Sequence, residues 1–291
     1  MTSLCRWGLL FALAVSGLSR GVAQIGSGVP SSMVVGVIKA ANVRGDVRKI
    51  SLSDRSESAL QNGDTLQQDH AVVTKGAASS AVLVFANGAT VRIGGDSRLE
   101  IKEFMMDPLQ ADVASVAALT NEPTTSRTQL RLEFGEMVGN VKTLNRAAGS
   151  SFSVGTPAGA AGIRGTTFRI VYRPTGNGQA FNFQLSTAEG VVLYEGVAQI
   201  GPSTANVPAG QEIIVIAQVD PTTNTLVVGA PTPPAGGGLS AEAATALQTA
   251  TIEIVQTQQQ TTFTKVEIQP PAPPPPPPPP TAPRTTPGDG R

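Results

Sequence analysis

Short apolar alternations, broken at close intervals by Gly, Asn and Asp, run from Val34 to about Val219 and constrain the fold more than any other feature. Successive side chains of a strand point to opposite faces, and frequent turn residues separate one strand from the next. The pattern therefore predicts an all-β domain over residues 34–219 that is built from many short strands.

The clearest hairpin surrounds Asn87-Gly88. The incoming strand, residues 81–85, is apolar at every position and is predicted to be buried on both faces. In the outgoing strand, residues 89–93, apolar side chains alternate with Thr90 and Arg92, which predicts one face in water. Asn and Gly both tolerate positive φ angles, so the dipeptide suits the tight turn between these strands.

Four later segments repeat the alternation. Their apolar positions are Leu130, Leu132 and Phe134; Phe168, Ile170 and Tyr172; Phe181, Phe183 and Leu185; and Ile214 and Ile216. Between Asp107 and Arg127 the pattern lapses, and an Ala-rich stretch at residues 110–119 predicts a helical turn inside a mobile surface loop.

The C-terminal part divides into a Pro/Gly linker (residues 229–238), a helix (residues 239–260) and a Pro-rich tail (residues 268–291). Ser240 is a suitable N-cap for the helix. The apolar stripe of the helix is thin and partly alanine, so it is expected to bury little area and bind weakly; it consists of Ala243, Leu247, Ala250 and Ile254. Eight consecutive prolines in the tail favour a disordered or extended rod that packs on nothing.

The first 23 residues have the three parts of a secretory signal peptide: Arg6, an apolar run from Leu9 to Val15, and small residues ending at Ala23. The run is shorter than a membrane span requires. We therefore expect cleavage before Gln24, no membrane-spanning segment afterwards, and an extracytoplasmic location that is periplasmic, cell-surface or secreted.

Cleavage would remove Cys5, the only cysteine, so the mature chain is predicted to have no disulfide or cysteine-ligated metal. It would also leave 19 basic and 21 acidic residues. This balance, with few aromatic residues, argues against a nucleic-acid partner, because such proteins need a basic face to neutralise phosphates.

The glycine-rich stretch at residues 152–168 invites comparison with phosphate-binding loops, but its glycines have neither G-x-G-x-x-G nor Walker spacing. The simpler interpretation is a close turn between two strands, with Arg164 paired or hydrogen-bonded at the turn. No cofactor is predicted.

Catalytic arrangements are weakly represented. His70 is the only histidine, so a multi-histidine zinc site is excluded and a Ser-His-Asp triad has one possible base. The carboxylates considered for glycoside hydrolysis are Asp96, Glu100, Glu133 and Glu136, and all are interpreted as surface charges. Asn62-Gly63-Asp64 and Gly94-Gly95-Asp96 lack the EF-hand pattern and are interpreted as ordinary turns.

Three segments in order resemble the FecR-type extracytoplasmic domain family: residues 83–93, residues 134–137, and residues 152–168 with their RGT sequence at 164–166. Residues 189–192 resemble the closing strand of that family. The resemblance implies a twisted, solenoid-like or sandwich-like β-stack without catalytic machinery. It also marks a structural motif, formed by Thr156, Pro157, Arg164, Gly165, Thr166 and Phe168.

FecR regulators place a cytoplasmic anti-sigma segment and a transmembrane helix before this domain, whereas here a removable signal is expected. The favoured hypothesis is therefore a stand-alone, non-enzymatic module that binds an envelope protein or a surface polymer. The alternatives are a ligand-sensing regulator of the FecR type and, last, a secreted carbohydrate-active enzyme.

Overall fold

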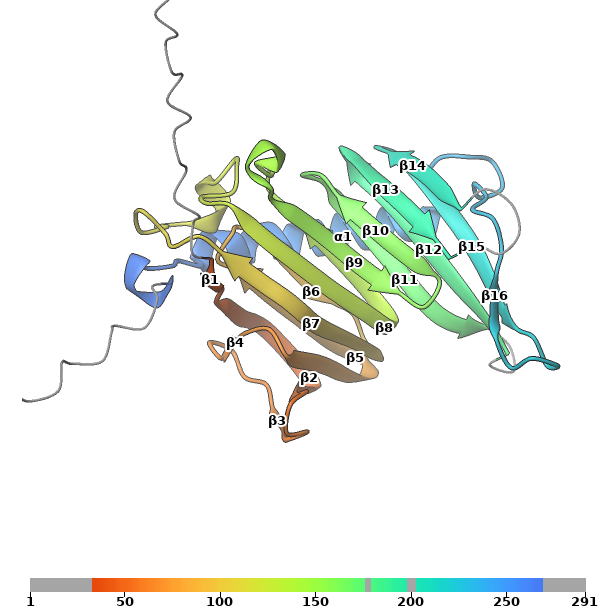
Figure 1. Ribbon diagram of the computed structural model, residues 1–291, viewed down its shortest axis with the longest axis horizontal. Helices are drawn as coiled ribbons and strands as arrows, with labels where there is room; N and C mark the ends of the chain where they lie inside the picture. The colour runs from red at the N-terminus through yellow and green to blue at the C-terminus, as the bar shows by residue number, and fades with distance from the viewer. Residues whose placement is uncertain (1–32, 176–178, 198–202, 269–291) are drawn as a thin grey trace, which may run out of the picture. The chain divides into compact units, whose positions relative to one another are not determined.

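The computed structural model describes residues 33–175, 179–197 and 203–268 (Figure 1). The predicted signal peptide and the tail after Ile268 lie outside the described residues. The strands are β1 (Val34–Val35), β2 (Ile38–Ser51), β3 (Glu57–Ala59), β4 (Thr65–Leu66), β5 (His70–Phe85), β6 (Thr90–Ile93), β7 (Ser97–Met106), β8 (Ser126–Asn140), β9 (Ser151–Thr156), β10 (Gly159–Ile163), β11 (Thr167–Thr175), β12 (Ala180–Glu189), β13 (Val191–Gly196), β14 (Thr204–Pro208), β15 (Gln211–Val219) and β16 (Leu226–Val228). The helices are α1 (Ala241–Gln260) and the 3-10 turns η1 (Val116–Ala118), η2 (Arg146–Ala148) and η3 (Lys265–Ile268).

The strands form an all-β fold of two layers that share their longest members. In the first layer, β5 pairs with β7, β7 with β8, and β8 with β9, followed by β10, β13 and β14. In the second layer, β5 pairs with β6, β6 with β8, and β8 with β11, followed by β12, β15 and β16. Strands β5 and β8 have 16 and 15 residues, run through both layers, and are longer than the short strands that make up most of the fold.

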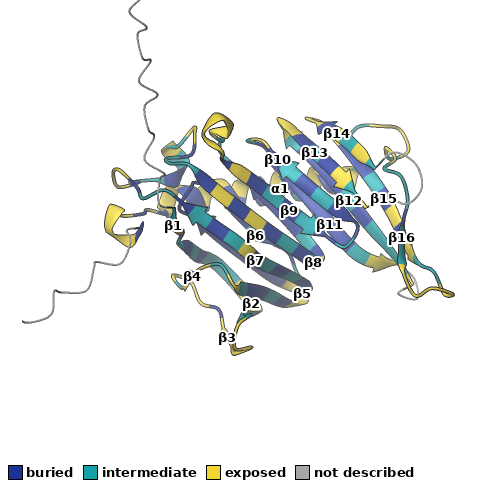
Figure 2. Cartoon of the chain, viewed as in Figure 1, coloured by how far each residue is buried: buried dark blue, intermediate teal, exposed yellow. Residues whose placement is uncertain are grey.

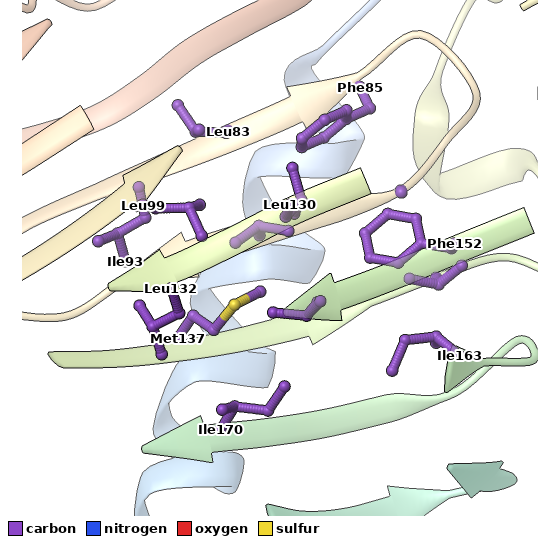
Figure 3. Close-up of a cluster of buried hydrophobic side chains, with 14 of the residues drawn as sticks. Leu83, Phe85, Ile93, Leu99, Leu130, Leu132, Met137, Phe152, Ile163 and Ile170 are labelled. Carbon is purple, nitrogen blue, oxygen red and sulfur yellow. The ribbon is translucent and has the colours of Figure 1, made fainter. Parts of the chain in front are cut away.

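The core lies between these layers. Phe85 of β5 packs edge-on against Phe152 of β9, with ring centroids 6.3 Å apart. Phe183 of β12 packs on Tyr194 of β13 at 5.0 Å. Figure 3 shows part of the same cluster, to which β5 to β11 contribute buried aliphatic side chains. These contacts join strands of opposite layers, which makes the fold sandwich-like.

The predicted hairpin at Asn87-Gly88 is present between β5 and β6, and residues 81–85 are fully buried as expected. Only Gly88 has a positive φ, 89°. Asn87 is buried, and its side chain donates to the hydroxyls of Ser126 and Thr128. Asn87 thus fixes the turn to β8 rather than supplying a left-handed conformation.

The prediction that one side of β6 faces solvent is wrong. Helix α1 crosses the outer face of the second layer, behind the strands in Figure 1, and covers Thr90 completely. The Gln258 amide donates to the Thr90 hydroxyl at 3.0 Å, and Arg92 pairs with Glu253. The covering helix lies about 160 residues further along the chain, so local alternation could not reveal it.

The C-terminal segment contributes more to the core than its composition suggested. Helix α1 begins after the Ser240 cap and buries its predicted stripe, with Ile254 fully covered. Phe263 is fully buried and pairs with Val113, which together with the buried Val116 anchors the supposed surface loop. Ile268, at the start of the predicted tail, is also buried.

Two further alternations end on the unexpected face. Phe134 is 42% exposed because the register of β8 against β7 shifts at Glu133, and Gly135 follows with a φ of 108°. In β15 the core receives Ile213, Val215 and Ala217, whereas Ile216 is exposed. Figure 2 shows the alternation of buried and exposed positions along the strands.

Candidate functional site

The motif at residues 156–168 forms a corner between the layers. Thr156 ends β9, and its hydroxyl donates to the Gly159 carbonyl at 2.9 Å and lies 3.3 Å from the Ala158 N–H. Pro157 and Ala158 complete the turn to β10. The Tyr194 hydroxyl donates to the Ala158 carbonyl at 2.9 Å, which ties this turn to β13.

The second part of the motif connects β10 to β11. Gly165 has a φ of 81°, and a Cβ there would lie 3.0 Å from the Thr143 Cα. Thr166 is buried, and its carbonyl accepts from the Val141 N–H at 2.9 Å. Phe168 is fully buried in the core. These residues therefore shape the corner and hold it to β8.

Arg164 does not have the role that the sequence suggested. It is exposed, and among the described residues its side chain makes no hydrogen bond or ion pair. It lines a shallow cavity of about 220 Å³ together with Arg146, Ser151, Ser153 and Gly162. Arg164 therefore presents a free positive charge beside the outer face of the first layer.

The buried arginine of this region is Arg169, five residues later and only 2% exposed. Its guanidinium donates to Glu136 at 2.8 Å, to Gln184 at 3.2 Å and to Glu242 of α1 at 2.7 Å. Burial opposes the charged form, but the hydrogen bonds and charges of Glu136 and Glu242 outweigh it and raise the pKa of Arg169. Alternation along β11 was a usable signal, because it places Arg169 opposite the core side chains.

A second, larger cavity of about 600 Å³ lies between α1 and the second layer. Arg92, Arg169, Glu136 and Glu242 line it, with small residues of α1 as the remaining wall. Sequence reasoning missed this site because it assigned Arg92 and Glu136 to solvated surfaces.

The carboxylates considered for hydrolysis do not converge on one another. Glu100 pairs with Arg98 at 2.8 Å, Glu133 pairs with Arg131, and Glu136 pairs with Arg169. Asp96 accepts the Gly76 N–H at 2.7 Å.

The remaining polar candidates make local contacts. The His70 ring nitrogen lies 3.2 Å from the Gln67 carbonyl. Asp64 pairs with Lys49 at 2.8 Å, and the hydrogen bond from Lys49 lowers the Asp64 pKa. Across the described ranges, no three His, Cys, Asp or Glu side chains are grouped to hold a metal ion.

No helix within the described part of the chain is both long and apolar enough to span a bilayer.

Comparison with known proteins gives one family match. Residues 70–193 match the family described as FecR protein. No curated protein matches. Two crystal structures of a proposed anti-sigma factor from Parabacteroides distasonis ATCC 8503 are similar at 14% and 13% identity, with TM-scores of 0.35 and 0.34. Each match covers 55% of this chain and 58% of the other.

Proposed function

Because residues 70–193 match the family described as FecR protein, we propose that this protein is a non-enzymatic, extracytoplasmic module that binds an anionic polymer of the cell surface. The observation that carries the proposal is the pair of exposed arginines, Arg146 and Arg164, on the shallow cavity beside β9 and β10. We call this cavity and its two arginines the corner site.

The charge of the corner site is available to a partner. Within the described residues, neither Arg146 nor Arg164 pairs with an acidic side chain. Guanidinium groups bind carboxylates and phosphates through paired hydrogen bonds, so the corner site fits a partner that carries such groups.

The lining of the corner site combines the two arginines and serine hydroxyls with apolar residues, Phe152, Ile163 and Leu193. A Cβ on Gly162 would meet nothing closer than 3.8 Å, so the fold itself does not require glycine there. Ser151 and Ser153 add hydroxyls to the same surface. Tight protein interfaces are usually centred on large aromatic or aliphatic anchors, whereas Phe152 and Ile163 at the corner site are already buried within this chain. A polar polymer therefore fits better than a folded protein.

The other two hypotheses do not draw on the corner site. A ligand-sensing regulator of the FecR type is supported by the same family match. A carbohydrate-active enzyme would need a pair of carboxylates around a bond, whereas Glu100, Glu133 and Glu136 each pair with an arginine.

Envelope sedimentation tests the proposal. The mature protein is incubated with cell-envelope fractions at low salt, and the Arg146→Ala/Arg164→Ala variant is expected to sediment much less than the wild type. Lys102→Ala is the matched control, because Lys102 is a half-exposed cation of the first layer outside the corner site. Its sedimentation should be unchanged.

The same assay separates the partner classes. Binding to a surface polymer should survive protease treatment of the envelopes and should weaken with salt. Loss of binding after protease treatment would point to a protein partner instead. Equal sedimentation of the wild type and the double variant would show that the corner site does not bind the envelope.

The extracytoplasmic location is part of the proposal and rests on the signal-like sequence before Gln24. N-terminal sequencing of material recovered outside the cytoplasmic membrane should begin near Gln24. An intact Met1 on that material would contradict cleavage.

A further inference from the structure

Arg92 and Arg169 lie at the same level of three adjacent strands. Arg92 of β6 and Arg169 of β11 are each the register partner of Val138 on β8. Neighbouring strands are ~4.8 Å apart, so the two arginine backbones are separated by roughly 10 Å. Val138 packs under α1 with Leu247 and Ile254, which places both arginines on the helix-covered face.

Arg169 has two hydrogen-bond partners on the second layer and one on α1. Glu136 and Gln184 come from the second layer itself. Glu242, in the first turn of α1, also accepts from Arg169, yet its side chain is 73% exposed. An exposed carboxylate gains little from an ion pair, because water competes for it. Another carboxylate entering the cavity can therefore take its place at low cost.

Arg92 has donors to spare. Its Nε donates to Glu253 at 2.7 Å, and no other hydrogen bond of its side chain occurs within the described residues. A guanidinium has five N–H donors, so both terminal nitrogens remain available.

The cavity between these arginines has the size of a small-molecule site. Its volume of about 600 Å³ is within the range of ligand pockets. The α1 side of the wall is made of small residues that leave this space open; they are Ala241, Thr245, Ala246, Thr249 and Ala250.

We propose that this cavity binds a small molecule with two carboxylates, one on Arg169 in place of Glu242 and the other on Arg92. Two separated carboxylates match two guanidinium groups that arise from strands on either side of β8. When the Glu242 side chain moves away, the ligand carboxylate takes its place, so Arg169 keeps an ion-pair partner. This site is separate from the corner site, and its test does not depend on the proposed function.

Calorimetric titration with succinate and acetate tests the proposal. Wild-type protein is expected to bind succinate more tightly than acetate, because acetate engages only one arginine. Glu242→Gln removes the competing charge but keeps an oxygen that can accept from Arg169. It should tighten succinate binding about two- to fivefold, which corresponds to the strength of an exposed ion pair.

Two further variants complete the design. Arg92→Gln should lower succinate affinity to that of acetate, provided that its circular dichroism spectrum matches the wild type. Glu195→Gln is the matched control, since Glu195 is an exposed carboxylate of the first layer. Equal affinities in wild type, Glu242→Gln and Glu195→Gln would overturn the proposal. So would equal binding of succinate and acetate, or no binding by wild type and Glu242→Gln.

Discussion

Gly139 and Phe168 face each other across β8 and β11, and a Cβ on Gly139 would lie 2.5 Å from the Phe168 ring. Gly139 has no positive φ, so its requirement is steric rather than conformational. The Phe168 ring thus occupies the space that a side chain at position 139 would need.

Gly139→Ala should destabilise the domain by about 1 to 3 kcal/mol, the usual cost of overpacking a core. Gly139→Ala should cost less stability when it is introduced into Phe168→Leu than when it is introduced into the wild type, because the smaller side chain leaves room for the added Cβ. Urea denaturation of the four proteins gives the coupling free energy. Strictly additive effects would show that the Gly139 and Phe168 positions are not in contact.

Arg169→Gln should destabilise the domain by about 2 to 4 kcal/mol, because it breaks a buried ion-pair network. Arg164→Ala should change stability by less than about 0.5 kcal/mol, as for other exposed positions without partners. Denaturant midpoints measured side by side check this ranking. A larger effect at Arg164 than at Arg169 would restore the structural role that the sequence suggested for Arg164.

Deleting residues 240–291 should lower the melting temperature by more than about 5 °C. The deletion uncovers Val138 and removes Phe263 and Ile268 from the core, and each large side chain contributes about 1.5 to 3 kcal/mol when buried. This reverses the expectation that the segment after the linker contributes little. Deleting residues 270–291 alone is the control and should leave melting unchanged, since a proline run cannot join a sheet or a helix interior. Equal melting of both truncations would contradict the packing role of α1.

Tyr194 should make stability fall at high pH. Burial raises the pKa of Tyr194 from 10.0 to about 12, so the folded state keeps its proton when the unfolded state loses it. Its contribution is complete below pH 10 and is lost as the pH rises from 10 to 12. Tyr194→Phe should have a flatter stability profile between pH 10 and 12 than the wild type, at some cost from the lost Ala158 hydrogen bond. Parallel profiles would show that Tyr194 does not titrate differently on unfolding.

Local patterns predicted the strands well where two paired strands are joined by a short turn. The β5–β6 hairpin and its buried incoming strand follow from residues 81–93 alone. The stripe of α1 was also predictable, since helical periodicity places Leu247 and Ile254 on one side.

The wrong predictions concern burial by segments that are distant in the sequence. Arg92 is paired and partly covered because α1 packs on β6. Ile216 is exposed because the opposite side of β15 faces the core. The two arginines of the motif region show the same limit. Arg164 belongs to the recognisable RGT sequence but is exposed, whereas Arg169 lies just outside it and is buried. A sequence motif gives residue identity, but only the fold determines which side chain has partners.

The passage of β5 and β8 through both layers has a consequence for any attempt to divide this protein. One end of each strand pairs with β7 of the first layer, and the other end pairs with β6 of the second layer. A cut that isolates one layer must therefore sever strands of the other. A split or exchanged fragment that corresponds to one layer would therefore leave backbone hydrogen-bonding groups of β5 and β8 unpaired.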